Sequence, residues 1–266
     1  MIVIEARALA ERISAGEDAD LCIIDLSSAE RYFQGHVPGA VYLNFKELLL
    51  GEAPAPGKLA RVDALESVFG RLGLKDNTTF VAYDDEGGGW AGRFLWTLDV
   101  LNIPGGLYLN GGIHAWEAEG LAQQTTPNKR VQTQPSLAVD RSQVPEIPEI
   151  LSALQKGEVQ IWDARSPAEY IGERHTAQKN GHIPGAINIE WTSLMDQTNA
   201  LKIRKDARDY LAKFGIDGSK PIITHCQSHH RSGFTYLVGK TLGFDIRAYH
   251  GSWSEWGNHP DTPVER

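Results

Sequence analysis

The feature that most constrains the fold of this 266-residue chain is an internal repeat. One apolar run ends in Asp25 and is followed by GHVPGA at residues 35–40, and another ends in Asp163 and is followed by GHIPGA at residues 181–186. Further segments match in the same order: residues 80–84 with 222–226, and residues 108–116 with 249–256. Because so many matched features occur in one order, we predict two copies of one domain.

Each copy alternates short apolar runs with helix-like segments, which predicts an α/β fold with a mainly parallel sheet and helices on both faces. In the first copy we expect strands at 21–25, 41–44, 80–83 and 106–109, and helices at 28–34, 63–72, 90–101 and 112–119. In the second copy we expect strands at 137–140, 161–163, 187–190, 222–225 and 246–249.

A polar stretch with prolines and no helical period separates the copies, and it is typical of a linker. We therefore predict an N-terminal domain at residues 1–124, a linker at 125–136 and a C-terminal domain at 137–266. The linker is long enough for the two domains to pack side by side.

The segment PIITHCQSHHRSG at residues 221–233 is the strongest candidate for a functional site. It predicts a buried strand, a tight loop from Cys226 to Arg231, and a helix that opens at Ser232. The loop follows the carboxyl end of a strand, where open α/β sheets bind ligands. Free N–H groups at a helix start favour an anion, so Cys226 should have a lowered pKa and act as a nucleophile.

A free cysteine is often only a small buried hydrophobe, and this is the alternative reading of Cys226. The polar residues that follow it cannot all be buried without partners, which favours a functional loop. Asp84 stands at the matching position of the first copy, so only the second copy carries the reactive group. Other chemically capable residues are interpreted as structural, most because both copies contain them: Asp25, Asp163, His36 and His182, with Arg165.

Composition excludes several classes of function. The net charge is −8 without a basic run, which argues against nucleic-acid binding. No signal peptide and no membrane-spanning stretch is visible. Two cysteines, Cys22 and Cys226, are too few for a structural zinc site. They are not expected to form a disulfide, which indicates that the protein is located in the cytoplasm. Residues 87–89 (GGG) lack a following Lys-Ser/Thr, so we expect no nucleotide, and no cofactor or metal.

The paired aspartates, the two GH(V/I)PGA segments and the Cys226 loop together resemble the tandem-domain rhodanese family of sulfurtransferases over nearly the whole chain. Within that family, the loop CQSHHR is most similar to that of the bacterial Azotobacter-type thiosulfate sulfurtransferases. The resemblance implies two rhodanese-like domains, of which the first is catalytically silent, and a persulfide on Cys226.

The resemblance also implies an enzyme that moves sulfane sulfur from thiosulfate to cyanide or a thiol by a ping-pong scheme. We expect substrate contacts from the loop and from two tryptophans: Gln227, Ser228, His229, His230, Arg231, Ser232, Trp90 and Trp191. The resemblance implies that the two tryptophans form an apolar wall, and packing in the core is the alternative for both. Vertebrate members carry an arginine where this chain has Glu169, so that role is not carried over. Arg231 is then the fixed cation of the loop, with His229 and His230 as titratable neighbours.

Two other functions remain open from the sequence. A sulfur carrier or redox protein that hands persulfide sulfur to a protein partner would use the same chemistry at Cys226. A Cys-based phosphatase would need a longer loop between cysteine and arginine, whereas here four residues intervene. We expect the partners to be a small anionic sulfur donor and a thiophilic acceptor, and the chain to be a monomer.

Overall fold

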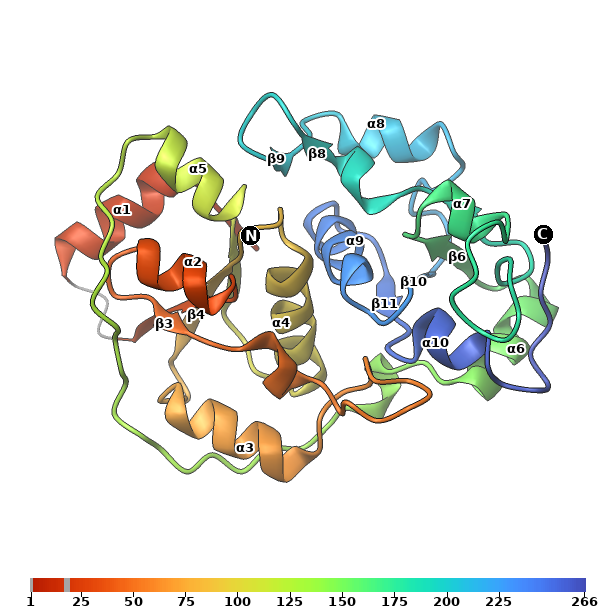
Figure 1. Ribbon diagram of the computed structural model, residues 1–266, viewed down its shortest axis with the longest axis horizontal. Coiled ribbons are helices and arrows are strands. Elements are labelled where there is room, and N and C mark those ends of the chain that lie inside the picture. The colour runs from red at the N-terminus through yellow and green to blue at the C-terminus, as the bar shows by residue number, and fades with distance from the viewer. Residues whose placement is uncertain (1, 17–19) are drawn as a thin grey trace.

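A parallel sheet forms the centre of the first half of the chain (Figure 1). The structure is a computed structural model that describes residues 2–16 and 20–266. The strand order is β1-β5-β4-β2-β3 and every pairing is parallel. The strands are β1 (Val3–Ile4), β2 (Leu21–Asp25), β3 (Val41–Tyr42), β4 (Thr79–Tyr83) and β5 (Gly106–Leu109). The predicted strands of this half are confirmed, and β1 is an addition.

Helices cover both faces of this sheet, as predicted. They are α1 (Ala6–Ala15), α2 (Ala29–Gln34), α3 (Val62–Arg71), α4 (Gly89–Val100) and α5 (Gly112–Ala118), with a 3₁₀ turn η1 (Phe45–Leu48). Side chains alternate along each strand. Ile24 packs in the core shared with α3 and α4, whereas its neighbour Ile23 packs with α1 and α5 on the other face.

The second half repeats the arrangement with the strand order β11-β10-β6-β7, again all parallel. Its strands are β6 (Gln160–Asp163), β7 (Ile187–Asn188), β10 (Ile222–His225) and β11 (Ile246–Ala248), and a small antiparallel pair joins β8 (Met195–Asp196) to β9 (Lys202–Ile203). The helices are α6 (Ile147–Lys156), α7 (Pro167–Tyr170), α8 (Ala207–Ala212), α9 (Arg231–Thr241) and α10 (Ser252–Trp256), with 3₁₀ turns η2 (Arg141–Gln143) and η3 (Trp191–Leu194).

The predicted strand at 137–140 is wrong, because residues 137–140 have no strand partner in the described structure. The Leu137 N–H donates to Glu66 Oε1 and the Asp140 N–H donates to the Val100 carbonyl oxygen, so the segment packs on the first half. Asp140 Oδ1 then accepts the Ser142 N–H and begins η2. The segment therefore continues the connection that runs past α3 in Figure 1.

The two halves meet where α4 lies against α9, in the middle of Figure 1. A Cβ atom on Gly92 would lie 2.2 Å from the carbonyl oxygen of Gly233, so the two backbones approach more closely than any side chain allows. Buried residues of both halves form one continuous core around this contact. As a result, the loop before α4 lies next to the loop before α9.

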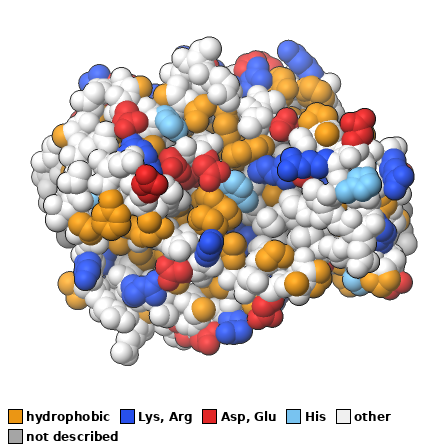
Figure 2. Space-filling model, in the orientation of Figure 1, with side chains coloured by type: hydrophobic (Ala, Val, Ile, Leu, Met, Phe, Trp, Pro, Cys, Tyr) orange, Lys and Arg blue, Asp and Glu red, His pale blue; other side chains and the backbone are white. Residues whose placement is uncertain are grey.

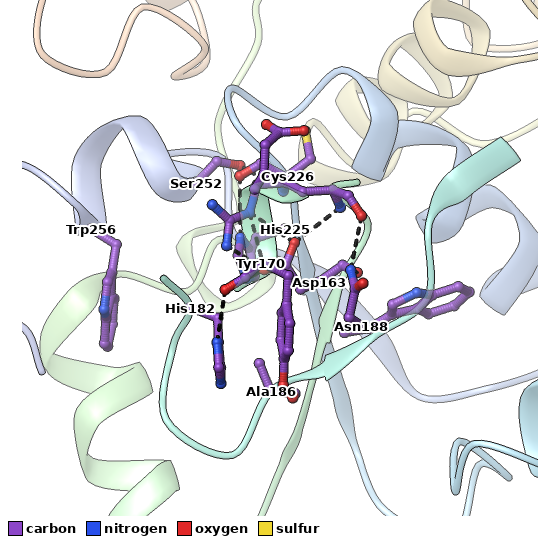
Figure 3. Close-up of polar contacts among 12 residues, drawn as sticks. Asp163, Tyr170, His182, Ala186, Asn188, His225, Cys226, Ser252 and Trp256 are labelled. Atoms are coloured by element: carbon purple, nitrogen blue, oxygen red, sulfur yellow. Dashed lines mark hydrogen bonds and ion pairs between the residues drawn. The ribbon is translucent and has the colours of Figure 1, made fainter. Parts of the chain in front are cut away.

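Residues that occur in both copies support the turns, as predicted. His182 Nδ1 lies 2.9 Å from the Tyr170 carbonyl oxygen and its ring stacks on Tyr170, and His36 contacts Tyr32 in the same way (Figure 3 shows His182). Asp163 forms a buried ion pair with Arg165 at 2.6 Å. None of the described helices is both long and apolar enough to cross a bilayer.

Candidate active site

Cys226 lies directly after β10, at the carboxyl end of the second sheet (Figure 3). Its carbonyl oxygen accepts the Trp253 N–H at 2.9 Å, and its own N–H donates to Ser252 Oγ at 3.3 Å. Sequence reasoning missed Ser252, which has a φ of 53° where the first copy has Gly112 with a φ of 58°. The sequence signal that could have identified Ser252 is that the repeat matches this serine to a glycine.

The Cys226 thiol is buried, yet its pKa is lowered. Burial alone would raise the pKa, but the positive charge of Arg231 and three hydrogen bonds to the sulfur outweigh it. The donors are Ser232 Oγ–H, at 3.4 Å from Sγ, and the backbone N–H groups of Ser232 and Ser228. By contrast, burial raises the pKa of the Cys22 thiol to about 11. Cys226 is therefore the thiol that is ionised more easily.

The matching loop of the first copy holds a carboxyl group that accepts three backbone N–H groups. Oδ1 of Asp84 accepts the Gly88 N–H at 2.8 Å and the Glu86 N–H at 3.1 Å, and Oδ2 accepts the Ala91 N–H at 2.9 Å. Asp84 is fully buried, and burial raises the pKa of its carboxyl although the three N–H groups act to lower it. The loop shape that the two copies share is thus suited to binding negative charge.

Arg231, which we predicted as the fixed cation of the loop, is paired with a carboxylate that the sequence did not indicate. Both terminal nitrogens of Arg231 donate to Glu169, at 2.7 and 2.8 Å. Burial opposes the ionisation of Glu169, but Arg231 and Ser166 outweigh it and lower the pKa of that carboxyl to about 2. Because Glu169 stands in the first turn of α7 and points toward the loop, Arg231 enters the site as half of an ion pair.

The sequence had suggested that His229 is a titratable group facing the substrate, but the structure places it elsewhere. It is fully buried, and burial together with the nearby Arg93, His250 and His230 holds its pKa well below the usual range. The chain turns inward at this residue, which has a φ of 55°. The imidazole therefore lies beneath the loop rather than at its mouth.

His230 lies at the mouth of the site with the two predicted tryptophans. Its ring stacks on Trp90 at 4.1 Å and lies 5.4 Å from Trp191. Its Nε2 lies 3.0 Å from Glu86 Oε2, so the matching loop of the first half contributes an acid that sequence reasoning missed. Figure 2 shows hydrophobic, acidic and histidine side chains gathered where the two halves meet.

The middle of the loop makes mostly structural contacts. Gln227 Nε2 donates to the Thr176 carbonyl oxygen at 3.1 Å, and a Cβ atom on Gly57 would lie 2.0 Å from the Ser228 carbonyl oxygen. Arg93, also from the first half, donates to the Gly57 carbonyl oxygen at 2.6 Å and is fully buried. The first half therefore shapes the active loop although it carries no cysteine there.

The described part of the chain contains no group of three or more His, Cys, Asp or Glu side chains placed to bind a metal ion.

The site contains a thiol with a lowered pKa, which loop N–H groups hold at the carboxyl end of a parallel sheet. Together with the two α/β halves, this site indicates the class of cysteine-dependent transferases. The rhodanese-like domain family matches residues 5–119 and 146–259. The chain belongs to the rhodanese family and is a sulfurtransferase with two such domains.

Curated relatives and solved structures agree with this assignment. The chain is 48% identical over 265 residues to the thiosulfate sulfurtransferase of Azotobacter vinelandii and 49% identical to that of Pseudomonas aeruginosa, covering 99% of this chain and 97% of each relative. The crystal structure of the 3-mercaptopyruvate sulfotransferase SseA from Escherichia coli is similar with a TM-score of 0.81 and 26% identity, over 94% of this chain and 98% of that one. EanB, at 22% identity and a TM-score of 0.86, shares the fold over 99% of this chain and 68% of its own.

Proposed function

We propose that the protein transfers sulfane sulfur from thiosulfate to cyanide or a thiol through a persulfide on Cys226. The Cys226 thiolate attacks the outer sulfur of thiosulfate, a new S–S bond forms, and the old S–S bond breaks as sulfite leaves with its electron pair. The acceptor then attacks the outer sulfur of the persulfide, and the Cys226 thiolate is released. This is a ping-pong reaction without a net redox change.

One observation carries the proposal: a buried thiol with a lowered pKa lies in a loop whose copy binds the Asp84 carboxyl group through backbone N–H groups. Such donors stabilise negative charge without reorganising as it shifts between sulfur atoms. The same donors would support the thiolate, the persulfide and the leaving sulfite.

We assign roles to the predicted residues on their contacts. Ser228 and Ser232 support the Cys226 sulfur, Gln227 holds the loop to Thr176, and Arg231 lowers the pKa of the thiol while paired with Glu169. At the mouth, His230 with Trp90 and Trp191 would orient the incoming donor or acceptor.

The proposed partners are small molecules, and the proposed unit is a monomer. Both cysteines are free and buried, which supports the proposed cytoplasmic location.

The assignment is tested by assaying thiosulfate with cyanide in the Cys226→Ser variant, with Cys22→Ser as the matched control. We expect thiocyanate formation to be lost with Cys226→Ser and kept with Cys22→Ser. Thiocyanate formation by Cys226→Ser would contradict the proposal. An aryl phosphate in the same assay tests the phosphatase reading, and its hydrolysis without sulfur transfer would favour that reading.

A sulfur carrier is the second candidate, because the chain is 28% identical over 256 residues to the sulfur carrier protein TtuD of Thermus thermophilus. The Arg231–Glu169 and His230–Glu86 pairs also reduce the charge offered to a small dianion. A carrier would release persulfide sulfur to a protein acceptor faster than to cyanide, and single-turnover rates with both acceptors separate the two functions.

A further inference from the structure

The active loop places a large side chain in a backbone conformation that favours glycine. His229, three residues after Cys226, has a φ of 55°, and Gly87, three residues after Asp84, has a φ of 96°. A residue with a Cβ atom is disfavoured in the left-handed region. Because the silent copy shows that glycine fits this position, the histidine side chain should have a role that a glycine cannot fill.

The His229 side chain connects to the reactive sulfur through one hydroxyl. His229 Nδ1 lies 2.8 Å from Ser232 Oγ, and Ser232 Oγ–H donates to Cys226 Sγ at 3.4 Å. His229 and Ser232 are both fully buried. The imidazole is further held by an edge contact with Trp96, whose ring centroid is 4.5 Å away at 86°. The three groups form a single chain of hydrogen bonds.

The surroundings keep this imidazole neutral. Burial disfavours its charged form first, and the charges of Arg93, His250 and His230 act in the same direction. The Cys226 sulfur faces Arg231, and its negative charge also favours the protonated form of Arg93. Consequently His229 carries one ring proton, on either Nδ1 or Nε2.

The direction of the Ser232 hydroxyl determines which ring nitrogen of His229 carries the proton. Ser232 has one hydroxyl proton, and a thiolate can only accept. If that proton points to the Cys226 sulfur, Ser232 Oγ can only accept from His229, so the ring proton must be on Nδ1. Hydrogen bonds in such a chain polarise one another, which strengthens the bond to the sulfur.

We propose that His229 is a positioning residue, which donates from Nδ1–H to Ser232 Oγ and thereby aims the Ser232 hydroxyl at the Cys226 sulfur. The inference rests on the proposed function of Cys226 as the nucleophile. It gives His229 a role in supporting the Cys226 thiolate, whereas the sequence analysis had predicted that His229 contacts the substrate.

The test measures the pH dependence of Cys226 alkylation by iodoacetamide, with no sulfur donor present, in His229→Gly, His229→Asn, Ser232→Ala and the double variant His229→Gly/Ser232→Ala. Asparagine tolerates positive φ and carries an amide N–H near the position of Nδ1. Alkylation of Cys22, which is buried with a raised pKa, reports unfolding in the same sample. Loss of one hydrogen bond to a charged sulfur should raise the pKa of Cys226 by about one unit, which lowers alkylation about tenfold at pH values below the wild-type pKa.

We expect this loss in Ser232→Ala and His229→Gly, little further loss in the double variant, and recovery in His229→Asn. A wild-type alkylation profile in His229→Gly, additive losses in the double variant, or equal losses in His229→Asn and His229→Gly would overturn the inference. If wild-type Cys226 instead reacts as slowly as Cys22, the proposed function itself fails.

A measurement on the unmodified chain covers the case in which a variant does not fold. Selective ¹⁵N labelling of histidine resolves the tautomer of each ring. We expect His229 to be neutral with the proton on Nδ1 between pH 6 and 8. A proton on Nε2, or a protonated ring in that range, would refute the proposed hydrogen-bond chain.

Discussion

Glu169 accepts a hydrogen bond from Arg231 on each of its two oxygens, at 2.7 and 2.8 Å, and only 3% of its side chain is exposed. The pair links α7 to the first residue of α9, next to Cys226. Arg231 therefore lowers the pKa of the thiol while two of its N–H groups are occupied by Glu169. The site is consequently less positive than the loop sequence suggests.

Replacing Glu169 with Gln should lower the KM for thiosulfate, because Arg231 would then offer an unbalanced positive charge to the dianion. A charge interaction of about 1 kcal/mol, the value for unit charges about 4 Å apart in water, corresponds to roughly a fivefold change. Steady-state assays over a range of salt concentrations measure it, and the effect should shrink as salt rises. The exposed Glu158 pairs with Lys156, so Glu158→Gln is the matched control. An unchanged KM in Glu169→Gln, or an equal change in the control, would contradict this explanation.

Glu169 should also make the stability of the protein depend on pH in acid. Its pKa is about 2 in the folded protein against an ordinary value of 4.5, so its ionised form stabilises the fold above about pH 4.5. That contribution is lost as the pH falls toward 2. The difference in unfolding midpoint between the wild type and Glu169→Gln should therefore shrink across this range. Urea titrations at a series of pH values measure it, and a constant difference would be inconsistent with the pKa shift.

Gly92→Ala should separate α4 from α9, because the new methyl group would lie 2.2 Å from the Gly233 carbonyl oxygen. We expect a loss of stability of about 1–3 kcal/mol from overpacking, and a drop in kcat/KM because the first half would no longer hold the active loop. In the control Gly106→Ala, the methyl group meets only the ends of Leu95 and Leu98 side chains, at 2.9 Å. Equal effects of the two variants on urea unfolding and on activity would show that the helix contact is not critical.

Trp90→Ala should lower kcat/KM through the loss of its stacking on His230. Aromatic contacts of this kind contribute about 0.5–1.5 kcal/mol, so we expect a loss of about twofold to tenfold. Trp90→Phe should retain most of the activity because a ring still faces the imidazole. Assays are run below the unfolding temperature of each variant, since Trp90 is also part of the core. If Trp90→Phe is as impaired as Trp90→Ala, stacking is not the cause.

The sequence was sufficient to predict the two α/β halves, the strands that end in Asp25 and Asp163, and the loop that places Cys226 between a strand and a helix start. These predictions depend on local patterns that occur twice, so each copy supports the other. The strand predicted at 137–140 was wrong because its polar contacts come from Glu66 and Val100, which are distant in sequence.

The roles of the loop residues could not be predicted for a similar reason. Arg231 is paired by Glu169, and His229 is buried beneath the loop near Arg93 of the other half. Both facts depend on side chains that the fold brings together. Glu86 and Gly57 reach the loop across the α4–α9 contact, and a pattern within one copy does not contain that contact.

The most direct test of the central claim is the mass of the intact protein before and after thiosulfate, followed by cyanide. Thiosulfate should add one sulfur, about 32 Da, located on the Cys226 peptide, and cyanide should remove it. No gain in mass, or a gain located on Cys22, would contradict the assignment of Cys226 as the sulfur-carrying residue.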